Sequence, residues 1–241
     1  MACNSTGGGG GGASLMASVT EEVPVQYSQL SQSELDEMYE AQNLTAAQKK
    51  SCDKYVQAKA EPGTLYSLSQ NMNYALVNDL PMNAAQKKTD QNLSEAMHDI
   101  GGNYELTRYD HQGQIDSLLA SAGLHGGYNN YSLEQLRSAL IGTEFHEKKY
   151  LSTSIDDFAS SPKSSKDVFQ TRAVKITYRT KSGTQVVIPG TGAGGNLGEI
   201  IVGKGQKQRI VGVNFTGKKA RAKGTQYYDR DQVELVVEIG D

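Results

Sequence analysis

One stretch of this chain, residues 187–202, reads Val-Ile-Pro-Gly-Thr-Gly-Ala-Gly-Gly-Asn-Leu-Gly-Glu-Ile-Ile-Val. The β-branched residues at its two ends favour strands, which we predict at residues 184–188 and 199–202. The glycines between them predict a loop, because glycine adopts backbone conformations that other residues avoid. Glu199 therefore stands at the entrance of an otherwise apolar strand. Such a carboxylate is either a solvated edge residue or a group kept for chemistry, since burying a lone carboxylate is costly.

The composition describes a rather polar chain that is long enough to bury a sizeable core. It has 241 residues, a formal net charge of −3, 37% hydrophobic residues and a mean hydropathy of −0.53. An acidic balance argues against a dedicated nucleic-acid binder, and no run approaches the ~18 apolar residues of a membrane span. Its two cysteines, Cys3 and Cys52, predict no disulfide framework.

Residues 1–30 form a predicted flexible leader. Six consecutive glycines at positions 7–12 cannot offset their ordering entropy by packing. A cationic start followed by an apolar core, which a signal peptide needs, is missing here. We therefore place the folded domain at residues 31–241.

Residues 31–100 carry helix-start signals, in which a capping side chain precedes an acid or amide by three positions. They predict helices at 33–42, 45–58 and 83–99, and the same signal recurs for a helix at 132–141. In residues 63–80, a buried helical face is predicted by the spacing of Leu65, Leu68, Met72, Leu76 and Leu80. The pentapeptide Ala-Ala-Gln-Lys-Lys occurs at 46–50 and at 84–88, which we interpret as helix-start chemistry and not as a structural repeat.

Residues 101–241 are mainly strands in this interpretation. Besides the two strands above, alternation or β-branched residues predict strands at 104–109, 151–155, 168–179, 208–215 and 232–239. Residues 123–130 are predicted to be a surface loop. Helices followed by strands with short connections indicate a single α+β domain with a mainly antiparallel sheet arrangement.

Two further groups of polar residues lie on predicted strands. Arg108 points the same way as Leu106, and an inward arginine is either paired with a carboxylate or binds an anion. Ser152, Thr153 and Ser154 follow one another on a strand, and buried hydroxyls need hydrogen-bond partners. The four histidines lack metal-ligand spacing, so no metal site is predicted.

In chain order, an arginine on a strand, Ser-Thr-Ser on a later strand and a glutamate opening another resemble one branch of the mono-ADP-ribosyltransferases. This arginine-serine-glutamate branch includes C3-like exoenzymes, binary actin-modifying toxins and phage-encoded transferases. The likeness extends to Leu44-Thr45-Ala46-Ala47-Gln48, Tyr55, Met72-Asn73-Tyr74-Ala75-Leu76 and Tyr150-Leu151-Ser152-Thr153-Ser154. It thus covers residues 31 to the C-terminus.

The resemblance implies N-terminal helices followed by two packed, mainly antiparallel sheets around an NAD cleft. It implies NAD-dependent transfer of ADP-ribose to a macromolecule with release of nicotinamide, and no metal. Arg108 would hold an NAD phosphate bidentately, and Glu199 would stabilise positive charge on the ribose. Ser152 would position Glu199, and the remaining NAD-binding residues would be Thr153, Ser154 and Asn73.

The chain departs from the family pattern two residues before the glutamate. Enzymes that modify arginine or related amides have Glu or Gln there, whereas this chain has Leu197, which can neither accept a proton nor hydrogen-bond an amide. Gly195, Asn196 and Leu197 are the predicted target-recognition residues. Three alternatives stay open: a more nucleophilic acceptor, water as acceptor (an NAD glycohydrolase), or a structural module that only keeps the fold.

The expected partners are NAD and an unidentified macromolecule, with no membrane, and the chain is expected to be a monomer. Residues 204–223 hold seven cations and no acid, which favours either a solvated sheet edge or a surface for an acidic protein or a nucleic acid. Localisation is left open, with delivery by a phage, by a secretion system or as part of a longer toxin as the alternatives.

Overall fold

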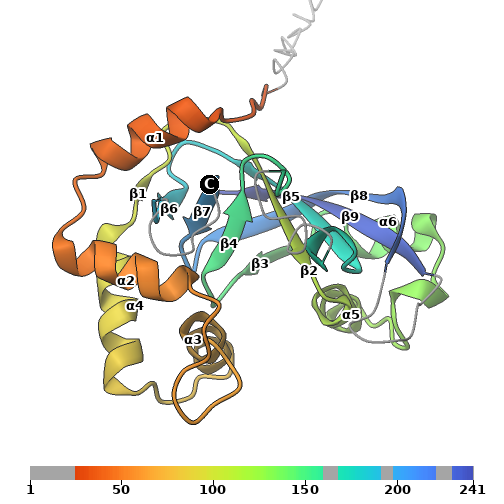
Figure 1. The fold of residues 1–241 in the computed structure, drawn as a ribbon. Helices are drawn as coiled ribbons and strands as arrows, with labels where there is room; N and C mark the ends of the chain where they lie inside the picture. Colours follow the sequence, from red (N-terminus) through yellow and green to blue (C-terminus); the bar gives the residue numbers. More distant parts are fainter. Residues whose placement is uncertain (1–24, 160–167, 191–197, 221–229, 241) are drawn as a thin grey trace, which may run out of the picture.

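A computed structural model describes residues 25–159, 168–190, 198–220 and 230–240 (Figure 1). Four helices come first: α1 (Gln32–Ala41), α2 (Ala46–Val56), α3 (Leu68–Val77) and α4 (Ala84–Ala96). After β1 (His98–Asp99) and β2 (Glu105–Asp110) follow α5 (Gln112–Ser121), the short 3₁₀ helix η1 (Tyr128–Asn130) and α6 (Leu133–Leu140). The remaining strands are β3 (Glu144–His146), β4 (Leu151–Ser154), β5 (Val174–Thr180), β6 (Gln185–Val187), β7 (Glu199–Val202), β8 (Lys207–Ala220) and β9 (Arg230–Ile239).

Helices α1 to α4 all begin with a capping box. In this motif the side chain of the N-cap residue accepts from the backbone N–H three residues later, and the side chain of that later residue accepts from the backbone N–H of the N-cap. Thr45 pairs with Gln48 at the start of α2, and Asn83 pairs with Gln86 at the start of α4. For α1 the cap is Ser31, two residues before the predicted start, and for α3 it is Ser67. These local bonds satisfy backbone N–H groups that a helix start otherwise leaves without partners.

Within the described residues, hydrogen bonds join the strands into one nine-stranded sheet in the order β1-β6-β7-β4-β2-β5-β9-β8-β3. Only β5 and β9 pair in parallel; the other neighbours are antiparallel. The predicted α+β class and mainly antiparallel pairing are thus confirmed, but a single sheet replaces the two that were predicted. The two halves meet between β2 and β4 through one pair of residues, Thr107 and Ser154.

The β6-β7 ladder separates two hydrophobic cores. Val187 and Ile201 face a smaller core that α2, α3 and α4 cover, with Cys52, Tyr55, Met72 and Leu93 fully buried in it. Their neighbours along the strands, Val186, Ile200 and Val202, belong to the larger core under the rest of the sheet. In Figure 1, α1–α4 accordingly gather on one side of the molecule, and α5 and α6 lie on the other. Both faces of this ladder are buried, so its sequence reads as an apolar run without polar alternation.

Several predicted element boundaries were wrong. The buried helical face predicted in residues 63–80 is shorter than expected, because its first and last residues lie outside α3. Leu65 precedes the Ser67 cap and is 91% exposed, and Leu80 follows the helix and is half exposed. The strand predicted from position 168 begins at Val174, because Phe169 instead packs against Phe158 and the Arg172 guanidinium. The predicted loop 123–130 contains η1, whose Tyr128 is buried and donates to the Asp231 carbonyl at 2.9 Å.

Candidate active site

Glu199 is the first residue of β7 and is only 9% exposed. The β4-β7 register places it directly opposite Ser154, so the two side chains share one face of the sheet. Ser152 lies two residues along β4, opposite Ile201 and on the same face. The carboxylate and the Ser152 hydroxyl are therefore diagonal neighbours, as the resemblance implies.

Arg108 links this ladder to the other half of the sheet. Its Nη1 donates to the carbonyl oxygen of Ser152 at 2.9 Å, and its Nε donates to Asp110 Oδ2 at 3.1 Å. The side chain is 18% exposed. Burial lowers the pKa of Arg108, but the Asp110 carboxylate together with Tyr178 and Tyr55 outweighs this, so the pKa is raised overall. The sequence left open whether Arg108 pairs with a carboxylate or binds an anion, and the structure shows that it pairs with the Asp110 carboxylate.

The hydroxyl of Tyr55, on α2, is buried beside the predicted residues and has a raised pKa. Burial raises its pKa most, a hydrogen bond from Asn73 lowers it, and the charges of Arg108 and Glu199 act on it with opposite signs. A hydrogen bond with the Ser152 side chain also lowers it. Groups on the three strands β2, β4 and β7 therefore influence the pKa of this one phenol.

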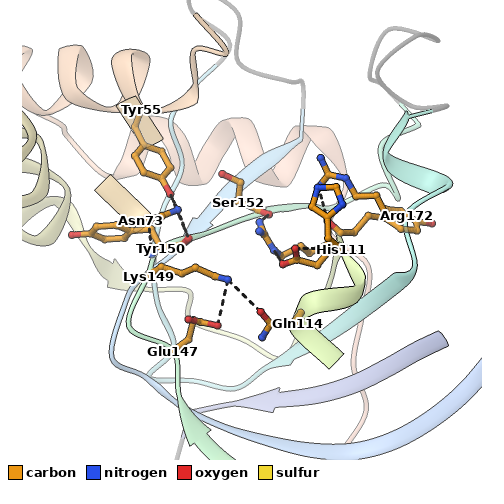
Figure 2. A network of polar contacts seen from close by, with 12 residues as sticks. Tyr55, Asn73, His111, Gln114, Glu147, Lys149, Tyr150, Ser152 and Arg172 are labelled. Atoms are coloured by element: carbon orange, nitrogen blue, oxygen red, sulfur yellow. Dashed lines mark hydrogen bonds and ion pairs between the residues drawn. The ribbon is translucent and has the colours of Figure 1, made fainter. Parts of the chain in front are cut away.

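Asn73 holds the start of β4 in place. Its amide nitrogen donates to the Tyr55 hydroxyl at 3.0 Å and to the Tyr150 carbonyl at 3.2 Å, and its amide oxygen accepts from the Tyr150 N–H at 3.2 Å. Figure 2 shows this cluster, with Ser152 on the strand that runs on from Tyr150. Asn73, predicted to contact NAD, thus bonds the backbone two residues before Ser152.

Asn73→Ala leaves two backbone groups of Tyr150 and the Tyr55 hydroxyl without this partner. We expect unfolding to become easier by about 1–3 kcal/mol, the usual cost of stranding buried polar groups. Asn78→Ala is a matched control, because Asn78 Nδ2 only bonds the Tyr74 carbonyl at the exposed end of α3. Urea denaturation of both variants measures the effect, and equal losses would contradict the assigned role.

The other two hydroxyls of the Ser-Thr-Ser segment are engaged by the protein itself. Thr153 Oγ1 donates to the Ile200 carbonyl at 2.9 Å. Ser154 Oγ donates to Asp156 Oδ1 at 2.7 Å and accepts from the Phe158 N–H at 3.2 Å. These bonds fasten β4 to β7 and shape the turn that leaves β4.

Arg172 is a residue that sequence reasoning missed. It lies two residues before β5 and donates from Nη1 to the Tyr109 carbonyl at 2.9 Å, while its buried Nε has no hydrogen-bond partner among the residues that the structure describes. Burial lowers the pKa of Arg172 most, Arg108 lowers it further, and Asp110 raises it. Arg172 and Arg108 are therefore close enough for their charges to repel each other, and Asp110 partly offsets this repulsion. The available signal was an arginine inside the strand predicted at 168–179.

Asp110 neutralises part of this cationic cluster. Burial raises the pKa of its carboxyl, but Arg108, Lys149 and the His111 N–H together lower it to about 2. Lys149 in turn contacts Gln114 Oε1 at 3.3 Å and Glu147 Oε2 at 3.8 Å (Figure 2). The cations Arg108, Arg172 and Lys149 thus have only Asp110 and Glu147 as carboxylate neighbours in the contacts described above. This excess of positive charge favours binding of an anion.

Asp110 makes stability depend on pH. Its folded pKa is depressed, so its contribution is present above the ordinary value near 3.8 and is lost as pH falls through about 2. We expect the wild-type free energy of unfolding to drop by about 2 kcal/mol more than that of Asp110→Asn between pH 4.5 and pH 2. Urea denaturation along this pH series checks it, with Asp36→Asn, which removes an exposed α1 carboxylate, as control. Parallel profiles for wild type and Asp110→Asn would contradict the expectation.

The predicted target-recognition residues Gly195, Asn196 and Leu197 lie outside the described residues. The two glycines that flank this segment are described, and both have positive φ: Gly190 at +81° and Gly198 at +86°. A Cβ on Gly190 would come within 2.7 Å of the Tyr39 ring. Gln42, at the end of the same helix α1, bonds both backbone groups of Ile188. The chain leading into the glycine-rich segment is therefore held by α1.

Much of the basic segment is neutralised where the structure describes it. Lys204 pairs with Asp90, Lys207 with Glu144 at 3.1 Å and Lys219 with Asp231 at 3.0 Å. These pairs favour the solvated-edge alternative over a nucleic-acid surface.

Two searches of the described ranges give negative results. They contain no group of three or more His, Cys, Asp or Glu residues that could hold a metal ion. No helix in them has the length and apolar character needed to span a bilayer.

Comparison with known proteins identifies the family. The model of the ADP-ribosyltransferase exoenzyme family matches residues 32–236. The chain belongs to this family. It is accordingly an NAD-dependent mono-ADP-ribosyltransferase. None of the curated protein sequences matches it.

Solved structures of ADP-ribosyltransferases share the fold at low sequence identity. The C3 exoenzyme of Clostridium limosum matches with a TM-score of 0.61 at 15% identity, over 90% of this chain and 98% of that one. Plx2a, an ADP-ribosyltransferase toxin of Paenibacillus larvae, matches with a TM-score of 0.60 at 14% identity, over 90% and 100%. The enzymatic component C2-I of the Clostridium botulinum C2 toxin matches with a TM-score of 0.60 at 17% identity, over 89% of this chain but 49% of that one.

Proposed function

We propose that the site around Tyr55 binds NAD and cleaves the bond between its ribose and nicotinamide, with Arg108, Ser152 and Glu199 as the central residues. The observation that carries the proposal is that Glu199 and Ser152 are diagonal neighbours on β7 and β4, while Arg108 Nη1 donates to the Ser152 carbonyl at 2.9 Å. These groups suit NAD, which combines phosphates for the guanidinium with a ribose that becomes positively charged during cleavage.

Arg108 and Arg172 hold the two phosphates in this proposal. Each arginine uses one donor on a backbone carbonyl of the strands around the site, Ser152 for Arg108 and Tyr109 for Arg172. The unpartnered Nε of Arg172 and its repulsion by Arg108 support it, because a bound diphosphate relieves both. Asp110 keeps the Arg108 guanidinium oriented.

Glu199 stabilises the transition state for loss of nicotinamide. The bond from ribose C1′ to the pyridine nitrogen breaks, its electron pair leaves with neutral nicotinamide, and positive charge develops on the sugar. A buried carboxylate beside that charge stabilises it more than it stabilises intact NAD. The acceptor then forms a bond to C1′ and gives up its proton. Ser152 positions Glu199, and the Asn73-Tyr55 pair holds the strand that carries Ser152.

The acceptor is a side chain of a protein target other than arginine in this proposal. Leu197, two residues before Glu199, offers no group that could take a proton from a guanidinium or bond an amide. A nucleophile that reacts without such help is therefore favoured. The toxins among the similar structures support delivery into a target cell as the setting.

One incubation tests the proposal: purified protein, NAD labelled in its adenylate half, and a cell lysate. We expect labelled protein and free nicotinamide, with the modified residue identified by mass spectrometry. Nicotinamide release with free ADP-ribose and no adduct would favour an NAD glycohydrolase instead. Failure to bind NAD at millimolar concentration would favour a module that keeps only the fold.

A further inference from the structure

A groove between α2 and α4 lies apart from the site around Tyr55 and encloses about 220 Å³. Its lining comes from equivalent positions of the two Ala-Ala-Gln-Lys-Lys segments, which begin α2 and α4. The lining pairs at equivalent positions are Ala47 and Ala85, Lys50 and Lys88, and, just after the pentapeptide, Ser51 and Thr89. The two pentapeptides thus do more than start two helices: they supply four of the eight residues that line one groove.

The floor of this groove is small and polar. Its buried lining residues are Ser51 and Thr89, which are 5% and 3% exposed, whereas Ala47 and Ala85, the second residues of the two helices, are exposed. Asn92 donates to Ser51 Oγ at 2.8 Å, which holds the two helices together at the floor. Drug-sized ligands occupy pockets of about 300–1,000 Å³, so this groove suits something the size of a headgroup.

The rim carries positive charge without a compensating acid. Lys50, Lys54 and Lys88 are exposed and line the groove, and its lining includes no carboxylate. Among the described residues these three lysines form no ion pair, whereas those from 148 to 219, apart from Lys218, each pair with a carboxylate. The nearby Asp90 is engaged by Lys204 and by the Tyr150 hydroxyl.

Both helix dipoles add to this potential. The groove begins at the first turns of α2 and α4, beside Ala47 and Ala85, where the aligned peptide dipoles place partial positive charge, and it extends to Lys54 and Asn92 in the second halves of the helices. In a chain with a net charge of −3, this is a local concentration of positive charge around a concave site. Lysine ammonium groups bind phosphates as point charges, and hydroxyls can supply further hydrogen bonds.

We propose that the α2-α4 groove binds a phosphomonoester borne by a small polyol, either free or as a lipid headgroup. The phosphate lies between Lys50 and Lys88, with Lys54 closing one end and the polyol over the two alanines. This binding does not depend on NAD or on the roles assigned to Arg108, Ser152 and Glu199.

Titration with inositol 1,4,5-trisphosphate, followed by calorimetry, tests the proposal on the full chain. We expect binding that weakens at least tenfold in Lys50→Gln/Lys88→Gln and less than twofold in Lys59→Gln/Lys218→Gln. The control variant removes the same charge from exposed lysines that lie outside the groove and have no ion pair in the described residues. Ala47→Leu/Ala85→Leu fills the groove without changing charge and should also abolish binding. Nicotinamide release from NAD should be unchanged in all three variants.

Vesicles of phosphatidylcholine with and without phosphatidylinositol 4,5-bisphosphate distinguish the two sources of the ligand. Groove-dependent binding to the phosphoinositide vesicles supports a lipid headgroup, and binding to the soluble probe alone supports a free ligand. The proposal is overturned if the soluble probe does not bind at millimolar concentration. It is also overturned if the control variant loses as much affinity as Lys50→Gln/Lys88→Gln, or if the leucine variant binds like wild type.

Discussion

Replacing Glu199 by glutamine lowers the rate of nicotinamide release by about 10²–10³-fold, the usual effect of removing one preorganised charge-stabilising group. Glutamine keeps the size of the side chain and its place opposite Ser154, but it cannot offset a positive charge on ribose. NAD affinity should change only severalfold, because the carboxylate acts mainly on the transition state. Chromatographic assay of nicotinamide and calorimetric titration with NAD separate the two effects.

Glu238→Gln is the matched control for this prediction. Glu238 lies on β9, where it pairs with Lys181 Nζ at 3.1 Å, and the same substitution there should leave nicotinamide release intact. Full activity in Glu199→Gln would sink the assignment of Glu199. A parallel collapse of NAD binding would instead give the carboxylate a role in holding the substrate.

Arg108→Lys should weaken NAD binding by about 10–100-fold, equivalent to about 1.5–3 kcal/mol for a lost charge-assisted hydrogen bond. Lysine keeps the charge but lacks the fork that reaches Ser152, Asp110 and a phosphate together. The thermal midpoint should also fall, because the Ser152 carbonyl loses its partner. Calorimetry with NAD and thermal denaturation give both readings.

Arg179→Lys provides the comparison for Arg108. Arg179 is also a sheet arginine that bonds a carboxylate, Glu105 Oε1, at 3.0 Å, and it lies over the Tyr27 ring. Its replacement should leave NAD affinity unchanged. If Arg108→Lys binds NAD like wild type, the phosphate role belongs to another cation, and Arg172 is the one to test next.

Local chemistry explains which elements could be predicted from the sequence. The starts of α2, α4 and α6 lay within one residue of prediction because each capping box is written in four consecutive residues. Helix α5 was missed because its N-cap, His111, makes no side-chain bond to the first turn. Strand β3 was missed because three residues at the sheet edge carry little periodicity.

Only the site residues whose order along the chain matches a family pattern could be predicted from the sequence. Arg108, Ser152 and Glu199 were predicted because their order along the chain resembles a family pattern. Tyr55 and Arg172 gain their importance from burial and from neighbours far away in sequence, which no local pattern records. Joining of the strands into one sheet likewise depends on the lone Thr107-Ser154 pair, a long-range contact.

The single residue pair between β2 and β4, Thr107 and Ser154, also has a mechanical consequence. Arg108 belongs to one half of the sheet and Glu199 to the other, so the joint with the fewest ladder bonds runs between the two chemical partners. A substrate that contacts both Arg108 and Glu199 would bridge the β2-β4 pairing and stabilise it. Amide hydrogens of β2 and β4 should then exchange with solvent more slowly once NAD is added, while those of the long β8-β9 ladder keep their rates.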